Sequence, residues 1–304
     1  MTRILVVGGQ GFIGRHIVDR AIGLGWNVTS LNFSDKLTPP LNNSVRYLAA
    51  DISNKPSLED ILGSAEFEYV VNSAGYIDHS LFFNDGRKLI NTHFIGVLNL
   101  VESLNRSVLK SFVNIGSSDE YGGCAAPQIE YLRESPISPY SLAKVATSHF
   151  LQMLYRTEHF PAVTLRLFLT YGPGQDQKRF LPQVIKGCLD NVSFSASEGK
   201  QLRDFCYISD TVDAVFSALH STEAHGEIIN IASGVPISLR QVVENIKATI
   251  GSGDPRFGDI PYRQGENMAL YANIKKAEKI LGWRPKVTFE EGLAHTINWC
   301  RDDS

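Results

Sequence analysis

The chain has 304 residues, 43% hydrophobic and 20% charged, and its formal net charge is −3 at pH 7. This is the composition of an ordinary globular protein, and the length suits one large domain with a smaller lobe. The small negative charge argues against nucleic-acid binding, and no apolar stretch reaches the roughly 18 residues of a membrane span, so we expect a cytoplasmic protein with neither kind of partner.

The four cysteines lie at positions 124, 188, 206 and 300, and no two of them share a CxxC spacing. The eight histidines are scattered and include no HExxH motif. The sequence therefore predicts reduced thiols and no bound metal.

The first half of the chain alternates short apolar runs with amphipathic helical stretches. Strands that are apolar throughout and separated by helices predict a parallel sheet covered on both faces, the doubly wound α/β arrangement of the Rossmann fold. The expected strands are 4–7, 27–31, 45–49, 69–72, 112–115 and 163–167, and the main helices are 12–24, 86–105 and 139–158.

The alternation loosens in the second half, where 171–175 is predicted to be a loop. The expected strands are 204–208 and 226–231, and the expected helices are 180–191, 209–219, 238–250, 273–281 and 289–299. We predict a dinucleotide-binding domain over 1–165, with a later contribution from about 204–231. Residues 166–304 then form mainly a smaller substrate-binding lobe, assembled from interleaved pieces.

Three glycines stand where the first expected strand meets the first helix: Gly8, Gly11 and Gly14. A dinucleotide-binding turn needs a positive φ, bare backbone against the pyrophosphate and close packing of the helix on the sheet. The N–H groups of Phe12 and Ile13, at the start of the helix, suit the diphosphate charge. This pattern predicts a dinucleotide site.

The residue that ends the second strand indicates which dinucleotide binds. An acidic residue normally holds the ribose 2′-hydroxyl of NAD there, whereas this chain has Asn32, followed by Ser34 and Lys36. The missing negative charge favours NADP(H), and NAD(H) stays possible because an amide also bonds a free hydroxyl. Asp51 and Ile52, after the third strand, are placed to meet the adenine edge, with a simple helix cap as the alternative.

Tyr140 and Lys144 lie four residues apart, which puts both on one face of the helix expected over 139–158. A nearby ammonium group favours the phenolate, so this pair suits proton transfer to or from an alcohol oxygen while a hydride moves at the carbon. Ser117, at the end of a predicted strand, is the candidate hydroxyl that bonds the reacting oxygen. Asp119 and Glu120 are either further acid/base groups or simple turn and cap residues.

With these residues in hand, the chain resembles the extended short-chain dehydrogenase/reductase family of nucleotide-sugar epimerases, dehydratases and reductases. The resemblance covers essentially the whole length. It is carried by residues 8–14, Asp51 and Ile52, Asn72 to Gly75, Asn91, residues 117–122, Tyr140 with Lys144, residues 171–173, residues 203–205, Asn230, residues 263–266 and residues 281–285.

The resemblance implies roles for particular residues. It matches Ser117 to the catalytic Ser/Thr of the family, and Tyr140 and Lys144 to its proton-relay pair. Arg203 and Arg263 match arginines that clamp the diphosphate of a nucleotide sugar, which suits the guanidinium fork. The remaining implied contacts are Ser73, Ala74, Gly75 and Asn91 with the cofactor, and Ser118, Phe180 and Glu266 with the substrate.

Two departures from the family pattern bear on the reaction. Leu169 replaces an Asn that commonly contacts the sugar diphosphate. Ser118 and Asp119 follow Ser117, where 4,6-dehydratases have Asp-Glu or Ser-Glu. The run most resembles reductases of 4-keto-6-deoxysugars, so we predict that reaction; 4-epimerisation with tightly bound NAD, 4,6-dehydration and a non-catalytic role are the alternatives.

The expected helices 86–105 and 139–158 resemble the pair that forms a four-helix dimer interface in this family. We therefore predict a homodimer, although Leu98, Val101, Phe150 and Leu154 suit either an interface or a core. The loop residues that would select the sugar are Tyr76, Asp78, His79 and Gln175.

Overall fold

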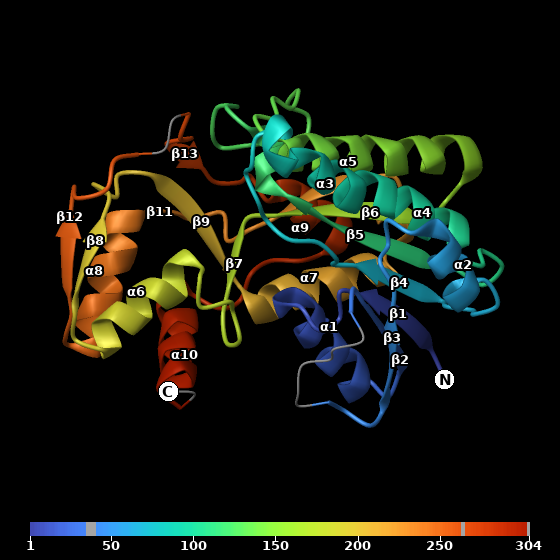
Figure 1. Cartoon of the computed structure of the whole chain (residues 1–304), viewed down its shortest axis with the longest axis horizontal. Coiled ribbons are helices and arrows are strands. Elements are labelled where there is room, and N and C mark those ends of the chain that lie inside the picture. The colour runs from blue at the N-terminus through green and yellow to red at the C-terminus, as the bar shows by residue number, and fades with distance from the viewer. Residues whose placement is uncertain (35–40, 263–264, 303–304) are drawn as a thin grey trace.

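A seven-stranded parallel sheet forms the centre of the computed structural model, which describes residues 1–34, 41–262 and 265–302 (Figure 1). The strand order is β10-β6-β5-β4-β1-β2-β3. The chain leaves β1 toward β2 on one side and reaches β4 on the other, so the crevice between the carboxyl ends of β1 and β4 is the place where such sheets bind ligands. The strands are β1 (Arg3–Val7), β2 (Asn27–Asn32), β3 (Val45–Ala49), β4 (Tyr69–Asn72), β5 (Ser111–Ser117), β6 (Ala162–Leu167) and β10 (Ile228–Ile231).

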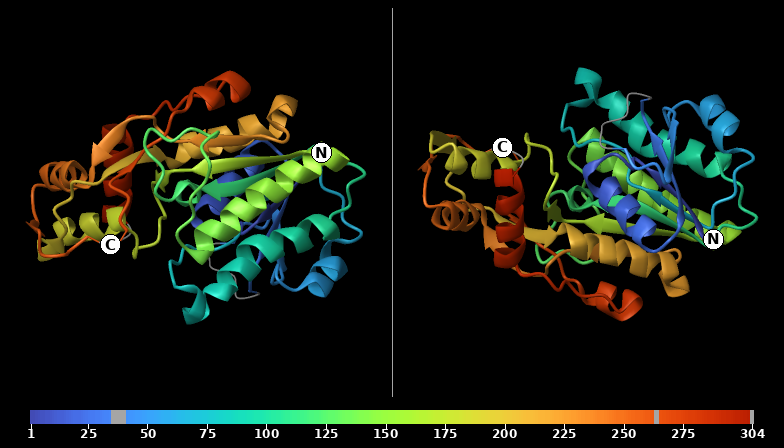
Figure 2. Two further views of the ribbon diagram at one scale, coloured as in Figure 1. Left: turned by 90° about the horizontal axis from the view of Figure 1, so that it is seen from above. Right: turned by 90° about the horizontal axis from the view of Figure 1, so that it is seen from below.

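Helices cover both faces of this sheet, as Figure 2 shows. One face packs against α1 (Phe12–Gly23) and α7 (Ile208–His220), and the other against α2 (Lys55–Leu62), α4 (Gly96–Ser103) and α5 (Pro139–Glu158). Each face buries its own apolar cluster, which explains why the strands are apolar throughout. The predicted doubly wound α/β fold is confirmed.

The segment predicted as one helix over 86–105 contains a π turn. It runs from the short helix α3 (Arg87–Ile90) through the π turn η2 (Asn91–Ile95) to α4, and it follows η1 (Phe82–Gly86), in which Asn84 and Asp85 have non-helical φ and ψ. A π turn adds a residue to a helix turn, and so rotates every side chain that follows it. The face that points at the sheet therefore cannot be read from a regular helical period here.

The smaller lobe contains three helices, a two-stranded sheet and a four-stranded sheet. The helices are α6 (Phe180–Leu189), α8 (Leu239–Ile250) and α10 (Phe289–Asp302), and their apolar sides share one cluster. The two-stranded sheet pairs β8 (Ser193–Ala196) with β12 (Asp254–Phe257). In the other sheet, β9 (Leu202–Tyr207) pairs with β7 (Leu169–Tyr171), β11 (Pro236–Ser238) and β13 (Ala269–Leu270).

Three short elements complete the described chain: η3 (Ser118–Tyr121), η4 (Thr222–Ala224) and α9 (Lys275–Leu281), which packs on β10. Val101 and Leu154 belong to the core on the α4 and α5 side of the sheet, so they are core residues rather than interface residues. None of the helices in the described part of the chain is both long enough and apolar enough to cross a membrane.

Candidate active site

The loop between β1 and α1 presents bare backbone at the carboxyl edge of the sheet. Gly8 has a φ of +78°, and a Cβ added to it would lie 2.9 Å from the Cα of Ala74, after β4. A Cβ on Gly14 would lie 2.1 Å from the Gly8 carbonyl oxygen. Gly11 begins α1 without a side-chain cap, so no side chain occupies the N–H groups of the first turn. The loop therefore fits the pyrophosphate of a dinucleotide.

Asn32, at the end of β2, holds this loop in place. Its side-chain Oδ1 accepts a hydrogen bond from the Gln10 backbone N–H at 3.1 Å, and its Nδ2 donates to the Ser30 carbonyl at 3.2 Å. The side chain is buried and uncharged. Ser34 is the last described residue before the gap at 35–40, so Lys36 lies outside the described residues.

Asp51 does not cap the helix that follows it. Its Oδ1 accepts from the backbone N–H of Ser53 at 2.8 Å and from the Ser53 hydroxyl at 2.7 Å, whereas Asn54 is the N-cap of α2. Ile52 is buried and packs so closely on Gly96 that a Cβ there would lie 2.7 Å from it. Contacts of Asp51 and Ile52 with an adenine ring stay a prediction.

His93 is the residue of η2 whose side chain is buried beside the predicted site. Asn91 is exposed, whereas His93 is buried and a Cβ on Gly75 would lie 2.1 Å from its ring. The His93 ring also makes an edge contact with Tyr140, with centroids 4.9 Å apart. Ser73, beside Gly75, is fixed by a hydrogen bond from its hydroxyl to the last carbonyl of β1 at 2.8 Å. A contact of Asn91 with the cofactor stays a prediction.

Ser117, Tyr140 and Lys144 come together at the carboxyl edge of β5. Ser117 ends the strand, and Ser138 caps α5 so that Tyr140 and Lys144 fall on its first two turns. The Lys144 Nζ donates to the Ile115 carbonyl at 2.7 Å and lies 5.9 Å from the centroid of the Tyr140 ring. Tyr140 also shares a side-chain hydrogen bond with Ser117. The three side chains predicted to carry the chemistry therefore adjoin.

Burial controls the protonation of this group. It raises the pKa of Tyr140, and the negative charge of Asp119 raises that pKa further. It lowers the pKa of Lys144 to about 8, with the charge of Glu120 acting in the opposite direction. Burial and the Lys144 charge together lower the pKa of His93 to about 3. Near pH 7 the phenol is protonated and the imidazole is neutral.

Three basic side chains act on Asp119: His79, in the loop after β4, and Arg179 and Arg203, which belong to the smaller lobe. The His79 Nε2 lies 3.8 Å from its Oδ2, and the charges of Arg179 and Arg203 also act on it. Burial raises the pKa of Asp119, whereas these three groups lower it. Arg203, on β9, is ion-paired with Glu266. Two arginines thus stand beside the predicted catalytic group.

Ser118, Phe180 and Arg263 are the other predicted substrate contacts. Ser118 is buried at the start of η3, and Phe180 begins α6 and packs at the edge of the lobe's apolar cluster. Arg263 lies outside the described residues. Over residues 1–34, 41–262 and 265–302, no three His, Cys, Asp or Glu side chains form a group that could hold a metal ion.

Two residues of this site were not singled out from the sequence, His93 and Arg179. His93 lies on η2, where a π turn changes the helical period, so its burial could not be predicted from the sequence pattern. Arg179 directly precedes Phe180 and carries no motif of its own. Its charge next to Phe180, an expected substrate contact, is the one feature of the sequence that could have indicated it.

Known proteins with the same architecture match nearly the whole chain. The solved UDP-glucose 4-epimerase of Thermotoga maritima with UDP-glucose is 28% identical, with 99% of each chain covered and a TM-score of 0.92. The UDP-glucose 4-epimerase of Thermus thermophilus in complex with NAD is 25% identical, with 100% of each chain covered and a TM-score of 0.90. A dTDP-glucose 4,6-dehydratase of Streptomyces niveus is 27% identical over 99% of this chain and 93% of the relative.

The family model described as "NAD dependent epimerase/dehydratase family" matches residues 4–232. That span runs from β1 through β10, and so includes the glycine loop, Ser117, Tyr140 and Lys144. The predicted resemblance to the nucleotide-sugar enzymes of the extended short-chain dehydrogenase/reductase type is confirmed, and the chain belongs to the NAD dependent epimerase/dehydratase family.

Proposed function

We propose that this protein is an NAD(P)-dependent oxidoreductase of a nucleotide sugar, and that its net reaction reduces the C4 keto group of an NDP-4-keto-6-deoxyhexose. The observation that carries the proposal is the group of Ser117, Tyr140 and Lys144 at the carboxyl edge of β5. Burial and the neighbouring Asp119 raise the pKa of Tyr140, so its side chain is a phenol. A phenol is a proton donor, which reduction of a ketone requires.

Each residue of the group has a defined part in this reaction. When bound, the reduced nicotinamide supplies a hydride. Tyr140 donates its phenolic proton to O4 as C4 is reduced, so that hydride and proton together convert the ketone into an alcohol. Ser117 hydrogen-bonds the same oxygen and polarises the carbonyl. Lys144, one turn along α5, compensates the negative charge that develops on the phenolic oxygen.

The cofactor would lie on the backbone of Gly8, Gly11 and Gly14, with its pyrophosphate at the start of α1. The neutral Asn32 supports NADP(H), because no carboxylate there repels a 2′-phosphate. NAD(H) is the alternative, supported by the NAD that the T. thermophilus relative binds. Ser73, Ala74 and Gly75 would line the same crevice, beside the buried His93, and Asn91 stays a proposed contact.

Arg203 would hold the diphosphate of the nucleotide sugar. It is mostly buried and ion-paired with Glu266, which orients its guanidinium group. A planar guanidinium suits two phosphate oxygens. The T. maritima relative, solved with UDP-glucose, supports a nucleotide sugar as the ligand class. Phe180 and Arg263 stay proposed contacts.

A second candidate, 4-epimerisation, is favoured by the match to the T. maritima UDP-glucose 4-epimerase over 99% of each chain. In that reaction Tyr140 first accepts a proton from O4 and then returns it after the sugar has turned over. 4,6-Dehydration would use Asp119, whose neighbour His79 lies 3.8 Å away.

The deciding experiment incubates the purified protein with NADPH or NADH and a panel of NDP-4-keto-6-deoxyhexoses. Stoichiometric NADPH loss with formation of one 4-hydroxy product is expected. Tyr140→Phe should abolish turnover, whereas the matched control Tyr155→Phe, on the same helix but outside the site, should retain it. Interconversion of C4-epimeric UDP-sugars without net cofactor consumption would identify an epimerase, and water loss from an NDP-hexose a dehydratase. Full turnover by Tyr140→Phe would refute the proton transfer.

A further inference from the structure

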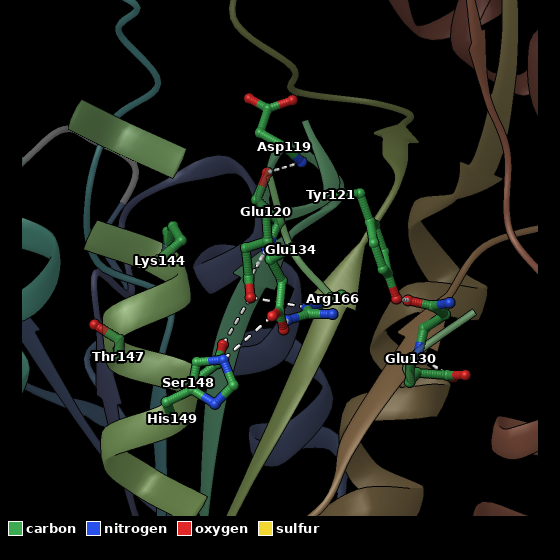
Figure 3. A network of polar contacts seen from close by, with 12 residues as sticks. Asp119, Glu120, Tyr121, Glu130, Glu134, Lys144, Thr147, Ser148, His149 and Arg166 are labelled. Carbon is green, nitrogen blue, oxygen red and sulfur yellow. Dashed lines mark hydrogen bonds and ion pairs between the residues drawn. The ribbon is translucent and has the colours of Figure 1, made fainter. Parts of the chain in front are cut away.

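Glu120 is a fully buried carboxylate directly beside the catalytic group, and the mechanism above gives it no part. It belongs to η3, and none of its surface is exposed. Its Oε1 accepts the backbone N–H of Ser117 at 2.9 Å. Its Oε2 accepts the Ser148 hydroxyl at 2.8 Å and the Arg166 Nε at 2.8 Å. Figure 3 shows this carboxylate between α5 and Arg166.

These bonds join the two elements that carry the catalytic side chains. Ser117 ends β5, and Ser148 lies on α5, one helical turn after Lys144 and two turns after Tyr140, so all three share a helix face. Arg166 adds the neighbouring strand β6. The Glu120 carboxylate therefore joins the strand that carries Ser117 to the helix that carries Tyr140, in addition to the hydrogen bond from Lys144 to the Ile115 carbonyl.

The residues around Glu120 pack tightly against its carboxylate. A Cβ added to Gly116 would lie 2.6 Å from the Glu120 Oε1 and 2.9 Å from the Thr164 side chain. Capping Ser117 alone needs no charge, because a neutral glutamine closes the same capping box. Burying a carboxylate is costly even when it is paired. The negative charge of Glu120 is thus the feature that a cap does not explain.

Glu120 faces two basic side chains, Arg166 and Lys144. Arg166 is fully buried and pairs with Glu120 and with Glu134, the latter at 2.5 Å. Glu134 is only partly buried and also lies 3.2 Å from His149, whereas Glu120 is fully buried and acts electrostatically on Lys144. The other titratable neighbours of Lys144 are Tyr140 and His93, and His93 is neutral because burial lowers its pKa to about 3.

We propose that Glu120 is a positioning residue for proton transfer: its carboxylate holds Ser117 against Tyr140 and supplies the counter-charge to Lys144. This inference rests on the proposed function, because its effect is exerted on the reaction of Tyr140. It assigns Glu120 no contact with substrate or cofactor.

The counter-charge has a signature in the pH dependence of reduction. The Glu120 charge raises the pKa of Lys144 and also that of Tyr140, on which Asp119, Arg179 and the Ser117 hydrogen bond act as well. Removing the Glu120 charge lowers both pKa values. Reduction needs the protonated phenol, so the alkaline limb of the kcat/KM profile should move to lower pH.

The test compares Glu120→Gln with Glu134→Gln. Both changes remove one acidic partner of Arg166, but Glu134 has no bond to Ser117 or Ser148 among the described contacts. For Glu120→Gln we expect kcat to fall about ten- to hundredfold, as for a small misplacement of reacting groups, with the cofactor Kd unchanged and the alkaline limb shifted. Glu134→Gln should lower the free energy of unfolding and leave the alkaline limb of the kcat/KM profile at its wild-type pH. Glu120→Asp keeps the negative charge, so its alkaline limb should lie at the wild-type pH.

The inference would be overturned if Glu120→Gln and Glu134→Gln had the same kcat and the same alkaline limb in their kcat/KM profiles. If Glu120→Gln fails to fold, Glu120→Gln combined with Arg166→Met removes both buried charges, and an unshifted limb in that protein is likewise a refutation. Failure of the proposed function looks different, because the wild type would then be inactive with every keto sugar, or Tyr140→Phe fully active.

Discussion

A methyl group added at Gly14 should weaken cofactor binding while leaving the fold intact. The Cβ of Gly14→Ala would lie 2.1 Å from the Gly8 carbonyl oxygen and 2.8 Å from the Gly9 Cα. Real Cβ atoms essentially never approach closer than 3.0 Å, so the start of α1 must move from the turn by about 1 Å. The N–H groups proposed to bind the pyrophosphate move with it.

The size of the effect follows from hydrogen-bond geometry. A bond stretched by about 1 Å is no longer a hydrogen bond. A hydrogen bond to a charged group contributes about 1.5–3 kcal/mol, so the loss of one weakens binding about ten- to hundredfold. The clash itself should lower the free energy of unfolding by about 1–3 kcal/mol, as overpacking does.

Calorimetric titration with NAD(H) and NADP(H) measures the binding change, and urea denaturation measures the stability change. Gly23→Ala is the matched control, since it lies in the last turn of the same helix and its added Cβ meets nothing within 4 Å. We expect Gly23→Ala to bind like the wild type and to be slightly more stable. Wild-type affinity in Gly14→Ala would refute the assignment of this loop to the cofactor.

Three other predictions follow from the same structure. Asn32→Asp keeps the acceptor for Gln10 but adds a negative charge, so paired titrations should show NADP(H) affinity falling at least about tenfold relative to NAD(H); an unchanged ratio contradicts the role of Asn32. Burial lowers the pKa of Lys144 from 10.5 to about 8, so the unfolded chain binds this proton more tightly and stability should rise by up to about 3 kcal/mol between those pH values. Urea denaturation of Lys144→Met should lack that rise, and an equal rise in both proteins would show that Lys144 is not its source. Ile95 and Met153 are exposed on η2 and α5, so sedimentation should find a dimer that Met153→Arg dissociates, and a monomeric wild type contradicts the predicted interface.

The sequence alone predicted the parts of this protein that depend on local periodicity. The apolar runs that became β1 to β6, the glycines that begin α1 and the spacing that puts Tyr140 and Lys144 on one face of α5 all act over a few residues. The strands β7, β8 and β11 to β13 were missed because each has only two to four residues and none has more than one buried residue, unlike the equally short β4 and β10. Their pairing with distant strands is what forms them.

The site shows the same division. The glycine loop and Ser117 could be named from the sequence, because a strand end or a helix start locates them. The buried place of His93 could not, since the π turn changes the helical period there. Arg179 likewise gains meaning only when the fold brings it near Asp119.

Local sequence thus determined that the chain folds as a doubly wound sheet with a dinucleotide turn and a Tyr/Lys pair. Tertiary structure decided how those groups are charged and held. Glu120 and Arg166 are 46 residues apart, and Arg203 and Glu266 are 63 apart. Burial and charge pairing depend on which distant elements come into contact, and no window of neighbouring residues contains that information.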